Sequence, residues 1–250
     1  MSPRSVLITG CNRGIGLELV KQFLKLDNPP IHLLATFRDE SSSEELLQLA
    51  KENGPGLMAL KFDVSKRDTF AAFVQEVGKI VGPENGLNLL IHNAGFMAEN
   101  RDLDKITPEE MLYSYEVNCV APLFLTREFL PLLKAAIKPD KPKFVIDQAA
   151  AILMSTAVAS IAENTGGGLY PYRASKSGLN MVMKSLSVDL KDTGILVMSM
   201  HPGWVKTRMG GPNALIDTDT CVSTMIQTLQ GLTEKDHGSF LRYNNTSIPW

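Results

Sequence analysis

Cysteine, net charge and long apolar runs are all scarce in this sequence. The 250 residues include three cysteines, an odd number spread far apart with no Cys-x-x-Cys pair. This pattern argues against a disulfide framework or a zinc site and suits a reducing compartment, so we expect no metal. The formal net charge of −2 gives no electrostatic reason to expect nucleic acid or a membrane surface as a partner.

Segments that would direct the chain out of the cytosol or into a membrane are also missing. The N-terminus lacks the charged and then apolar regions of a signal peptide. The longest weakly polar run, residues 149–162, contains three hydroxyl side chains and is shorter than the roughly 20 residues that a membrane span needs. We therefore expect a cytoplasmic protein with no membrane partner. The hydrophobic content of 44% is typical of a globular protein with a sizeable core.

What the sequence does have is a regular alternation of short apolar segments and amphipathic ones. Strands are expected at 6–9, 31–36, 57–62, 87–92, 195–200 and 240–243, with a fifth strand bracketed by 144–146 and 149–155. Helices are expected after Gly14, at 41–51, at 66–81, after Thr107, at 170–191 and at 219–232. This alternation predicts an α/β fold in which residues 1–250 form a single doubly wound (Rossmann-like) domain. We expect an about seven-stranded parallel sheet, with helices on both faces and ligands at the carboxyl edge.

The first strand opens directly into a glycine-rich turn that precedes a helix. The turn comprises Gly10, Cys11, Asn12, Arg13, Gly14, Ile15 and Gly16, with the spacing G-x-x-x-G-x-G. Glycines let the backbone approach a pyrophosphate closely, and the free N–H groups and dipole of the helix N-terminus favour its charge. The same spacing also occurs in ordinary glycine turns, but its place between a first strand and a first helix favours a dinucleotide site.

The end of the second strand is where a nucleotide-binding fold meets the adenosine ribose. An acid there would hydrogen-bond a free 2′-hydroxyl, whereas an arginine accommodates a 2′-phosphate. The chain has Phe37 followed by Arg38, and Arg13 is available in the glycine turn. Two guanidinium groups at this point favour NADP over NAD. The alternative is a surface arginine paired with Asp39, which leaves the missing acid unexplained.

Tyr172 and Lys176 are four residues apart and leave the same face of the helix expected at 170–191. An ammonium roughly 4 Å from a phenol stabilises the phenolate by up to about 4 kcal/mol at an effective dielectric of about 20. Such a charge would lower the tyrosine pKa from about 10 and make Tyr172 a usable general acid at neutral pH. The alternative is an ordinary, partly buried tyrosine beside a solvated lysine, since this spacing alone has little specificity.

Other small or polar residues sit where a cofactor would be expected. Asn93, Ala94 and Gly95 form a turn after the fourth strand, where a cofactor could lie flat. Asn118 lies within a helix, where an asparagine is usually only tolerated but can divert backbone hydrogen bonds and hold a water. Residues 208–217 have little periodicity, and we expect them to form a mobile lid over the site.

Taken in order, these features resemble the short-chain dehydrogenase/reductase family in its single-domain form. They are the glycine turn, Asn93-Ala94-Gly95, Asn118, Tyr172 with Lys176, and Pro202-Gly203. The stretches ITGCNRGIGLELV, LYPYRASKSGLN and HPGWVKT resemble the branch of sniffer-type carbonyl reductases. The resemblance covers essentially the whole chain. It implies NADPH-linked hydride transfer to an aldehyde, ketone or quinone, by a homodimer or homotetramer joined through the helices of Asn118 and Tyr172.

The resemblance also implies a role for each matching residue. Tyr172 would be the proton donor, Lys176 would tune it and bind the nicotinamide ribose, and Asn118 would fix a water in a proton relay. Arg13 and Arg38 would hold the 2′-phosphate. Further contacts would come from Asp63 and Val64 at the adenine, from Asn93, Ala94 and Gly95 at the middle of the cofactor, and from Pro202, Gly203, Val205 and Thr207 at the carboxamide.

Two positions depart from the family pattern. The family usually has a Ser-Ser pair after the fifth strand, where this chain has Ser155 and Thr156. Thr156 keeps a hydroxyl that could polarise a carbonyl, although its β-branch restricts the rotamer; we rank it first, Ser155 second and Ser160 third. His92 stands where the family usually has asparagine. His92 and His201 flank the site in sequence but fit no metal motif, so we expect both to be structural.

Three functions are compatible with these residues. The first is an NADPH-dependent carbonyl reductase with Tyr172 as proton donor. The second is an NADP-binding sensor or scaffold with weak or no catalysis, although a pure binding module has no need of an acid. The third is an alcohol dehydrogenase that works in the oxidative direction with the same residues. The sequence does not identify the substrate.

Overall fold

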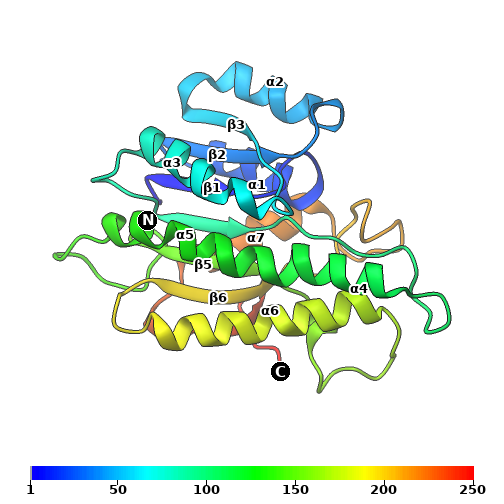
Figure 1. The fold of residues 1–250 in the computed structure, drawn as a ribbon. Helices are drawn as coiled ribbons and strands as arrows, with labels where there is room; N and C mark the ends of the chain where they lie inside the picture. Colours follow the sequence, from blue (N-terminus) through cyan, green and yellow to red (C-terminus); the bar gives the residue numbers. More distant parts are fainter. Residues whose placement is uncertain (1) are drawn as a thin grey trace.

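The computed structural model describes residues 2–250, and one parallel sheet runs through its centre (Figure 1). The strand order is β3-β2-β1-β4-β5-β6-β7, and all neighbouring strands are parallel. Because the order reverses beside β1, a ligand crevice is expected outside the carboxyl ends of β1 and β4. The predicted doubly wound, single-domain α/β fold is confirmed. The strands are β1 (Ser5–Ile8), β2 (His32–Phe37), β3 (Leu57–Lys61), β4 (Leu89–His92), β5 (Ala150–Met154), β6 (Leu196–His201) and β7 (Phe240–Arg242).

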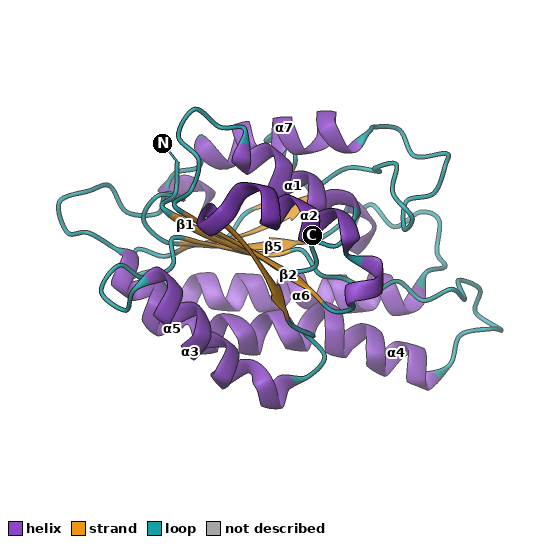
Figure 2. Ribbon diagram, turned by 90° about the horizontal axis from the view of Figure 1, so that it is seen from above, coloured by secondary structure: helices purple, strands orange, loops and turns teal. Residues whose placement is uncertain are grey.

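Helices cover both faces of the sheet, which lies between them as a middle layer (Figure 2). Val6 and Ile8 of β1 belong to one apolar cluster and Leu7 to the other, as the alternation of side chains along a strand requires. Burial on both faces explains why the strands read as continuous apolar segments. One face carries α1 (Gly14–Leu24), α2 (Glu44–Asn53) and α7 (Thr218–Gln230); the other carries α3 (Phe70–Val81), α5 (Ala121–Ala136) and α6 (Tyr170–Asp189), with α4 (Pro108–Tyr115) leading towards α5.

Several element boundaries differ from the sequence-based prediction, and the fifth strand and the third helix are examples. The fifth strand is β5 alone, because residues 144–146 form an irregular segment in which Phe144 has a left-handed φ of 58°. Phe144 and Ile146 are nevertheless buried in the core, which accounts for their apolar character. The helix predicted at 66–81 begins instead as a short 3-10 turn, Arg67–Thr69, and α3 itself starts at Phe70.

The helix predicted after Thr107 begins as expected but is not continuous. The Glu110 N–H donates to the Thr107 hydroxyl and the Thr107 N–H donates to the Glu110 carboxylate, which together form a capping box. A π turn, Glu116–Val120, separates α4 from α5. Such turns are rare and often occur at functional sites. This one contains Asn118.

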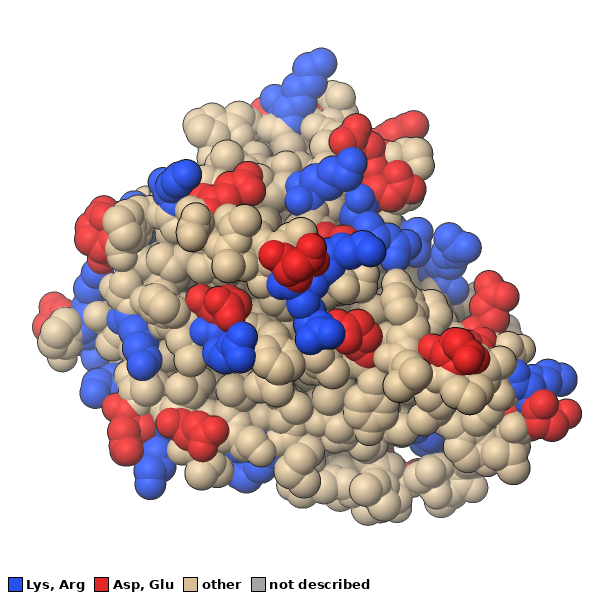
Figure 3. Space-filling model, viewed as in Figure 1, with Lys and Arg blue, Asp and Glu red and all other residues tan. Residues whose placement is uncertain are grey.

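Surface charge, helix hydrophobicity and the state of the cysteines can each be compared with the expectations from composition. Acidic and basic side chains are intermixed on the face shown in Figure 3, without a patch of one sign. Between residues 2 and 250, no helix has both the length and the apolar character needed to span a bilayer. All three cysteines are free and buried.

Candidate active site

The glycine turn between β1 and α1 has a conformation that lets a ligand come close to its main chain. Gly10 and Gly14 have positive φ angles of 73° and 59°. A side chain at Gly16 would collide with the Gly10 carbonyl oxygen. Arg13, the N-cap residue of α1, makes no side-chain cap, and the first turn of α1 contains no acid. The free N–H groups of this helix end are therefore available to an anion such as a pyrophosphate.

Asn93 and Thr9 hold this turn against the end of β4. The Asn93 side-chain amide donates to the carbonyl oxygens of Thr9 and Gly10, each at 2.9 Å. The Thr9 hydroxyl accepts the N–H groups of Asn93 and Ala94, each at 3.1 Å. Thr9 was not recognised in the sequence, where the only signal was a hydroxyl at the end of the first strand. The side chain of Asn93 therefore positions the turn, and its place in the cofactor site remains a prediction.

The two arginines predicted to recognise a 2′-phosphate are exposed on the loops that follow β1 and β2. Within residues 2–250, neither Arg13 nor Arg38 takes part in an ion pair. The alternative, an ion pair between Arg38 and Asp39, is not seen among residues 2–250, where the Asp39 carboxylate accepts hydrogen bonds from Ser41. Both guanidinium groups are thus free to bind an anion.

Two other predicted cofactor residues are engaged in local turns. The Asn12 side-chain amide donates to the main chain and hydroxyl of Ser42, which connects the glycine turn to the loop after β2. The Asp63 carboxylate accepts the N–H and the hydroxyl of Ser65 at 2.9 and 2.8 Å. Val64, the next residue, is half-buried and lines a small cavity together with Thr9 and Ala94. These contacts fix the loops and leave their main-chain groups as the candidate contacts to a cofactor.

Lys176 is an almost fully buried cation on α6, with 4% of its surface exposed. Its ammonium donates to the Met154 carbonyl oxygen at 2.7 Å, at the end of β5. Burial lowers the pKa of Lys176 from 10.5 to about 8. An ammonium has three donors, so this contact leaves two of them without a partner among residues 2–250. Such a group is suited to acceptors that a ligand brings, for example the hydroxyls of a ribose.

Tyr172 is half-buried one helical turn before Lys176. The prediction that Lys176 lowers the pKa of this phenol is wrong for the geometry seen here. Burial raises the pKa of Tyr172 from 10.0 to about 12, and no neighbouring charge offsets the effect. The physical reason is that the Lys176 ammonium is directed at the Met154 carbonyl oxygen. Tyr172 is therefore a protonated phenol at neutral pH.

Asn118 ties the loop after β4 to the helix of Tyr172. It is completely buried; its side-chain oxygen accepts the Phe96 N–H at 2.8 Å, and its amide donates to the Phe96 carbonyl oxygen and the Ser175 hydroxyl. Both amide protons are used, so a water in a proton relay would need the remaining side-chain lone pair or the main chain. A side chain on Gly95 would lie 3.5 Å from the Asn118 oxygen and 3.7 Å from the Lys176 ammonium. Gly95 thus keeps the space beside both groups open.

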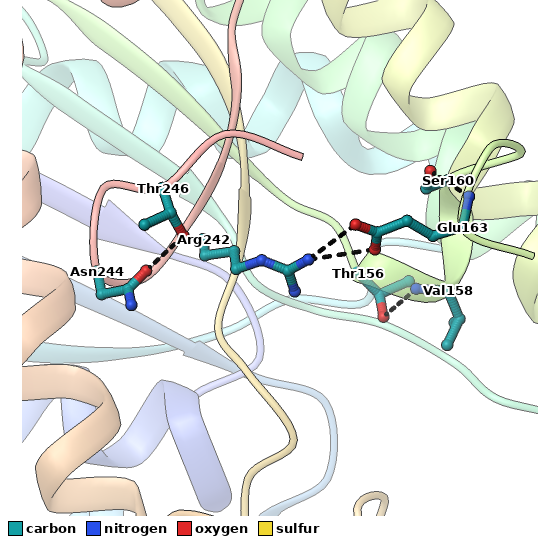
Figure 4. A network of polar contacts seen from close by, with 7 residues as sticks. All are labelled: Thr156, Val158, Ser160, Glu163, Arg242, Asn244 and Thr246. Carbon is teal, nitrogen blue, oxygen red and sulfur yellow. Dashed lines mark hydrogen bonds and ion pairs between the residues drawn. The ribbon is translucent and has the colours of Figure 1, made fainter. Parts of the chain in front are cut away.

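The three candidate hydroxyls after β5 differ in their surroundings; Figure 4 shows two of them, Thr156 and Ser160. The Ser160 hydroxyl accepts the Glu163 N–H at 3.1 Å, and it stabilises a turn. The Thr156 hydroxyl accepts the Val158 N–H at a longer 3.4 Å, which leaves its proton free to donate. The Ser155 hydroxyl is buried and has no partner within the described chain. These contacts are compatible with Thr156 as the first candidate for the hydroxyl that polarises a carbonyl, and Ser155 remains the second candidate.

Both candidate histidines, His92 and His201, form hydrogen bonds within the fold. The His92 ring nitrogen Nε2 lies 2.8 Å from the Thr126 hydroxyl, and burial lowers the pKa of His92 to about 3. The His201 ring nitrogen Nδ1 accepts the Gly203 N–H at 3.3 Å, and burial lowers its pKa to about 4. Both rings are therefore neutral at physiological pH. Among residues 2–250 there is no group of acidic, histidine or cysteine side chains arranged to hold a metal ion.

The segment after β6 lies against the glycine turn. A side chain on Gly14 would come within 3.3 Å of the Thr207 methyl group. Gly203 has a φ of 89°, and Val205 is buried and bridges to Ile216. The predicted lid, 208–217, is closed at its base because the Lys206 N–H donates to the Ile216 carbonyl oxygen at 2.8 Å. Its mobility remains a prediction.

Together these contacts bring the loops after β1, β4, β5 and β6 to the same edge of the sheet. The edge offers an uncapped helix end for a pyrophosphate and a buried ammonium with unused donors. A half-buried phenol and free hydroxyls complete the set. This combination can bind a dinucleotide and deliver a proton to an oxygen atom beside it.

Comparisons with known proteins agree with this arrangement. The family model described as "short chain dehydrogenase" matches residues 4–215. The structure of the carbonyl reductase Sniffer of D. melanogaster is 41% identical, with all of both chains covered and a TM-score of 0.96. The NADPH-bound carbonyl reductase from chicken fatty liver is 37% identical, also with full coverage of both chains and a TM-score of 0.93. An uncharacterized oxidoreductase of Schizosaccharomyces pombe is 28% identical over 260 residues, covering 97% of this chain and 96% of the relative. This chain therefore belongs to the short-chain dehydrogenase family.

Proposed function

We propose that this oxidoreductase is an NADPH-dependent carbonyl reductase in which Tyr172 gives a proton to the oxygen of an aldehyde, ketone or quinone. The observation that carries the proposal is the pairing on α6 of a half-buried, protonated phenol with a buried ammonium that has unused donors. A binding module would gain nothing from burying such a cation next to an acid. The carbonyl reductases to which the chain is similar, one of them with bound NADPH, support the same activity.

The bound cofactor would supply a hydride to the carbonyl carbon. The pyrophosphate would be held by the free N–H groups of α1, and the 2′-phosphate by Arg13 and Arg38. Lys176 would hold the ribose and place its positive charge near the reacting oxygen. Tyr172 would transfer its proton to that oxygen, and Thr156 would donate a hydrogen bond to it as negative charge develops.

The high pKa of Tyr172 favours reduction over the oxidative direction. In reduction the proton goes to a nascent alkoxide, which is a stronger base than a phenolate, so a phenol with a pKa of about 12 can still donate it. Oxidation of an alcohol would require the phenolate as base, and little phenolate exists at neutral pH with this pKa. The oxidative alternative is thus expected only at high pH.

The proposal is tested by the loss of reduced-nicotinamide absorbance in the presence of a panel of quinones, aldehydes, ketones and steroids. We expect oxidation of NADPH with at least one carbonyl and much slower oxidation of NADH. Tight NADPH binding without turnover on any member of the panel would instead indicate a sensor or scaffold.

Charge reversal at Arg38 tests the choice of cofactor. Hydrogen bonds to charged groups contribute roughly 1.5–3 kcal/mol, so Arg38→Glu is expected to raise the KM for NADPH about 10- to 100-fold. The KM for NADH should stay the same or fall. Lys25→Glu is a matched control, since Lys25 is exposed at the opposite end of α1. Equal effects of the two variants would exclude Arg38 from the site.

The rank of the three hydroxyls is tested at Thr156. Removal of one donor to a developing oxyanion typically costs about 10²- to 10³-fold in kcat, which we expect for Thr156→Val. Thr156→Ser, which restores the usual family residue, should retain activity. Ser155→Ala and Ser160→Ala are the comparison variants. Full activity of Thr156→Val together with a large loss in Ser155→Ala would transfer the role to Ser155.

Self-association through the helices of Asn118 and Tyr172 also remains a proposal, as does a cytoplasmic location. Exposed apolar side chains lie on both helical segments: Leu112, Tyr113 and Tyr115 on α4, and Met181 and Val188 on α6. The surface over the middle of α6 is mostly uncharged in Figure 3, which suits burial against a second copy.

A further inference from the structure

The segment between β5 and α6 has to hold Thr156 in a fixed position relative to Tyr172, although the two side chains lie on different elements. Thr156 follows the last residue of β5, and Tyr172 lies in the first turn of α6. Within this turn the Thr156 carbonyl oxygen accepts the Ala159 N–H at 2.9 Å, but the hydrogen bond to its hydroxyl is long, at 3.4 Å. Gly167, Gly168 and Leu169, just before the helix, all have positive φ angles, and nothing lies near the Cβ position of Gly167. Main-chain hydrogen bonds from Ala162 to Trp250 and from Leu169 to Arg101, each 3.0 Å, attach the segment to other loops, but neither reaches the Thr156 hydroxyl.

Arg173, the residue after Tyr172, supplies a direct connection. Its Nη1 donates to the Val158 carbonyl oxygen at 2.8 Å, two residues beyond Thr156. Its Nε donates to the Gly167 carbonyl oxygen at 3.1 Å, at the other end of the same segment. A guanidinium is planar and carries donors in a fixed fork, so one side chain can bind both carbonyl groups at once.

The helical repeat places this connection beside the catalytic pair. Residues four apart share a face of a helix, so Tyr172 and Lys176 form one such pair and Arg173 and Ser177 form the next. The Ser177 hydroxyl donates to the Ala159 carbonyl oxygen at 2.7 Å. One face of α6 therefore carries the acid and the ammonium, and the adjacent face binds the turn that carries Thr156.

We propose that Arg173 is a positioning residue that fixes the Thr156 hydroxyl relative to the Tyr172 hydroxyl. This inference rests on the proposed reductase function and adds to it a residue that acts through Thr156. The outer part of the same segment is held differently, by an exposed ion pair in which Arg242 Nη2 lies 3.0 and 3.1 Å from the two Glu163 carboxylate oxygens (Figure 4). Exposed ion pairs contribute little, so this second contact should not set the position of Thr156.

The test compares Arg173→Met with two controls. Arg4→Met also removes a half-buried guanidinium that donates to a carbonyl oxygen, that of Val81 at 3.2 Å, but Arg4 precedes β1 at the opposite end of the sheet. Glu163→Gln breaks the outer ion pair. We expect Arg173→Met to lower kcat roughly 10- to 100-fold, the scale of a misplacement of about 1 Å, with an unchanged dissociation constant for NADPH. Both controls should stay within about twofold of wild type. Arg173→Lys, which keeps the positive charge but lacks the planar fork of donors, should restore part of the loss.

Two further readouts separate positioning from a general structural role. In a Thr156→Val background, Arg173→Met should cause little additional loss, because the group that it positions is already absent. Hydrogen exchange should become faster at 157–168 in Arg173→Met and stay unchanged at 204–216. An equal loss in both backgrounds, or unchanged exchange at 157–168, would overturn the inference. The exchange measurement needs no turnover, so it shows whether Arg173 holds the segment of Thr156 even if no carbonyl is reduced and the reductase proposal itself fails.

Discussion

Replacing Tyr172 by phenylalanine is expected to lower kcat by roughly 10²- to 10⁴-fold, the range that a positioned general acid contributes. The phenyl ring keeps the packing of the half-buried side chain and removes only the hydroxyl. The dissociation constant for NADPH should stay within a factor of about two, since phosphate recognition belongs to the glycine turn and the arginines. Steady-state oxidation of NADPH, together with a fluorescence titration of its binding, measures the two quantities separately.

Tyr170→Phe is the matched control for this variant. Tyr170 lies on the same helix only two residues away, but its side chain is 38% exposed and leaves a different face. We expect that variant to keep its activity. Wild-type turnover in Tyr172→Phe would remove Tyr172 from the mechanism, whereas equal losses in both variants would indicate damage to the start of α6.

Lys176→Met is expected to lower kcat/KM by on the order of 10²- to 10³-fold, because it removes the one buried cation among residues 2–250, whose charge we propose lies near the reacting oxygen. Unlike Tyr172→Phe, this change should also weaken NADPH binding, since the same ammonium would hold the ribose. Lys184→Met, on an exposed position of α6, is the control. Full activity of Lys176→Met would contradict the proposed electrostatic role.

The same substitution should not destabilise the protein when no NADPH is present. A buried lysine whose pKa is about 8, against 10.5 when unfolded, carries a cost of roughly 3 kcal/mol below pH 8. Loss of its hydrogen bond to the Met154 carbonyl oxygen offsets part of the gain, at about 1–3 kcal/mol. We therefore expect Lys176→Met to unfold at an equal or higher temperature than wild type. A clearly lower melting temperature would show that Lys176 stabilises the fold and would contradict a net cost of its burial.

The low pKa of Lys176 makes both the stability of the protein and its activity depend on pH. In the folded protein Lys176 loses its proton as the pH rises through about 8, while the unfolded chain keeps it until about 10.5. The contribution of Lys176 to stability therefore becomes more favourable between these values, and Lys176→Met should lack that rise. The kcat/KM for NADPH should fall over the same range, because the ammonium disappears. The activity profile and the melting temperatures would be recorded in the same buffers.

The fold could be predicted from the sequence because the spacing of apolar residues and glycines reflects the strands, helices and turns directly. The alternation of buried strands and amphipathic helices predicts the doubly wound sheet, and the positive φ angles of Gly10 and Gly14 correspond to the glycine turn. The fifth strand was less accessible. Phe144 and Ile146 are as buried as strand residues, so composition alone could not show that the chain leaves the strand conformation there.

The site was predicted less completely, because side-chain direction depends on tertiary contacts. The spacing of Tyr172 and Lys176 predicts a shared helix face, yet the ammonium is directed at the Met154 carbonyl oxygen on another element. Thr9 and Arg173 were missed for a similar reason. Their partners, the turn after β4 and the segment after β5, are distant in sequence or irregular, and no local pattern indicates them.

A crystal structure of the protein with NADP⁺ tests the central claim most directly. The account predicts a nicotinamide ring in contact with the Tyr172 hydroxyl, a pyrophosphate on the N-terminus of α1, and a Lys176 ammonium that donates to the ribose. A nicotinamide ring remote from Tyr172, with the phenol covered by the chain's own side chains, would contradict it.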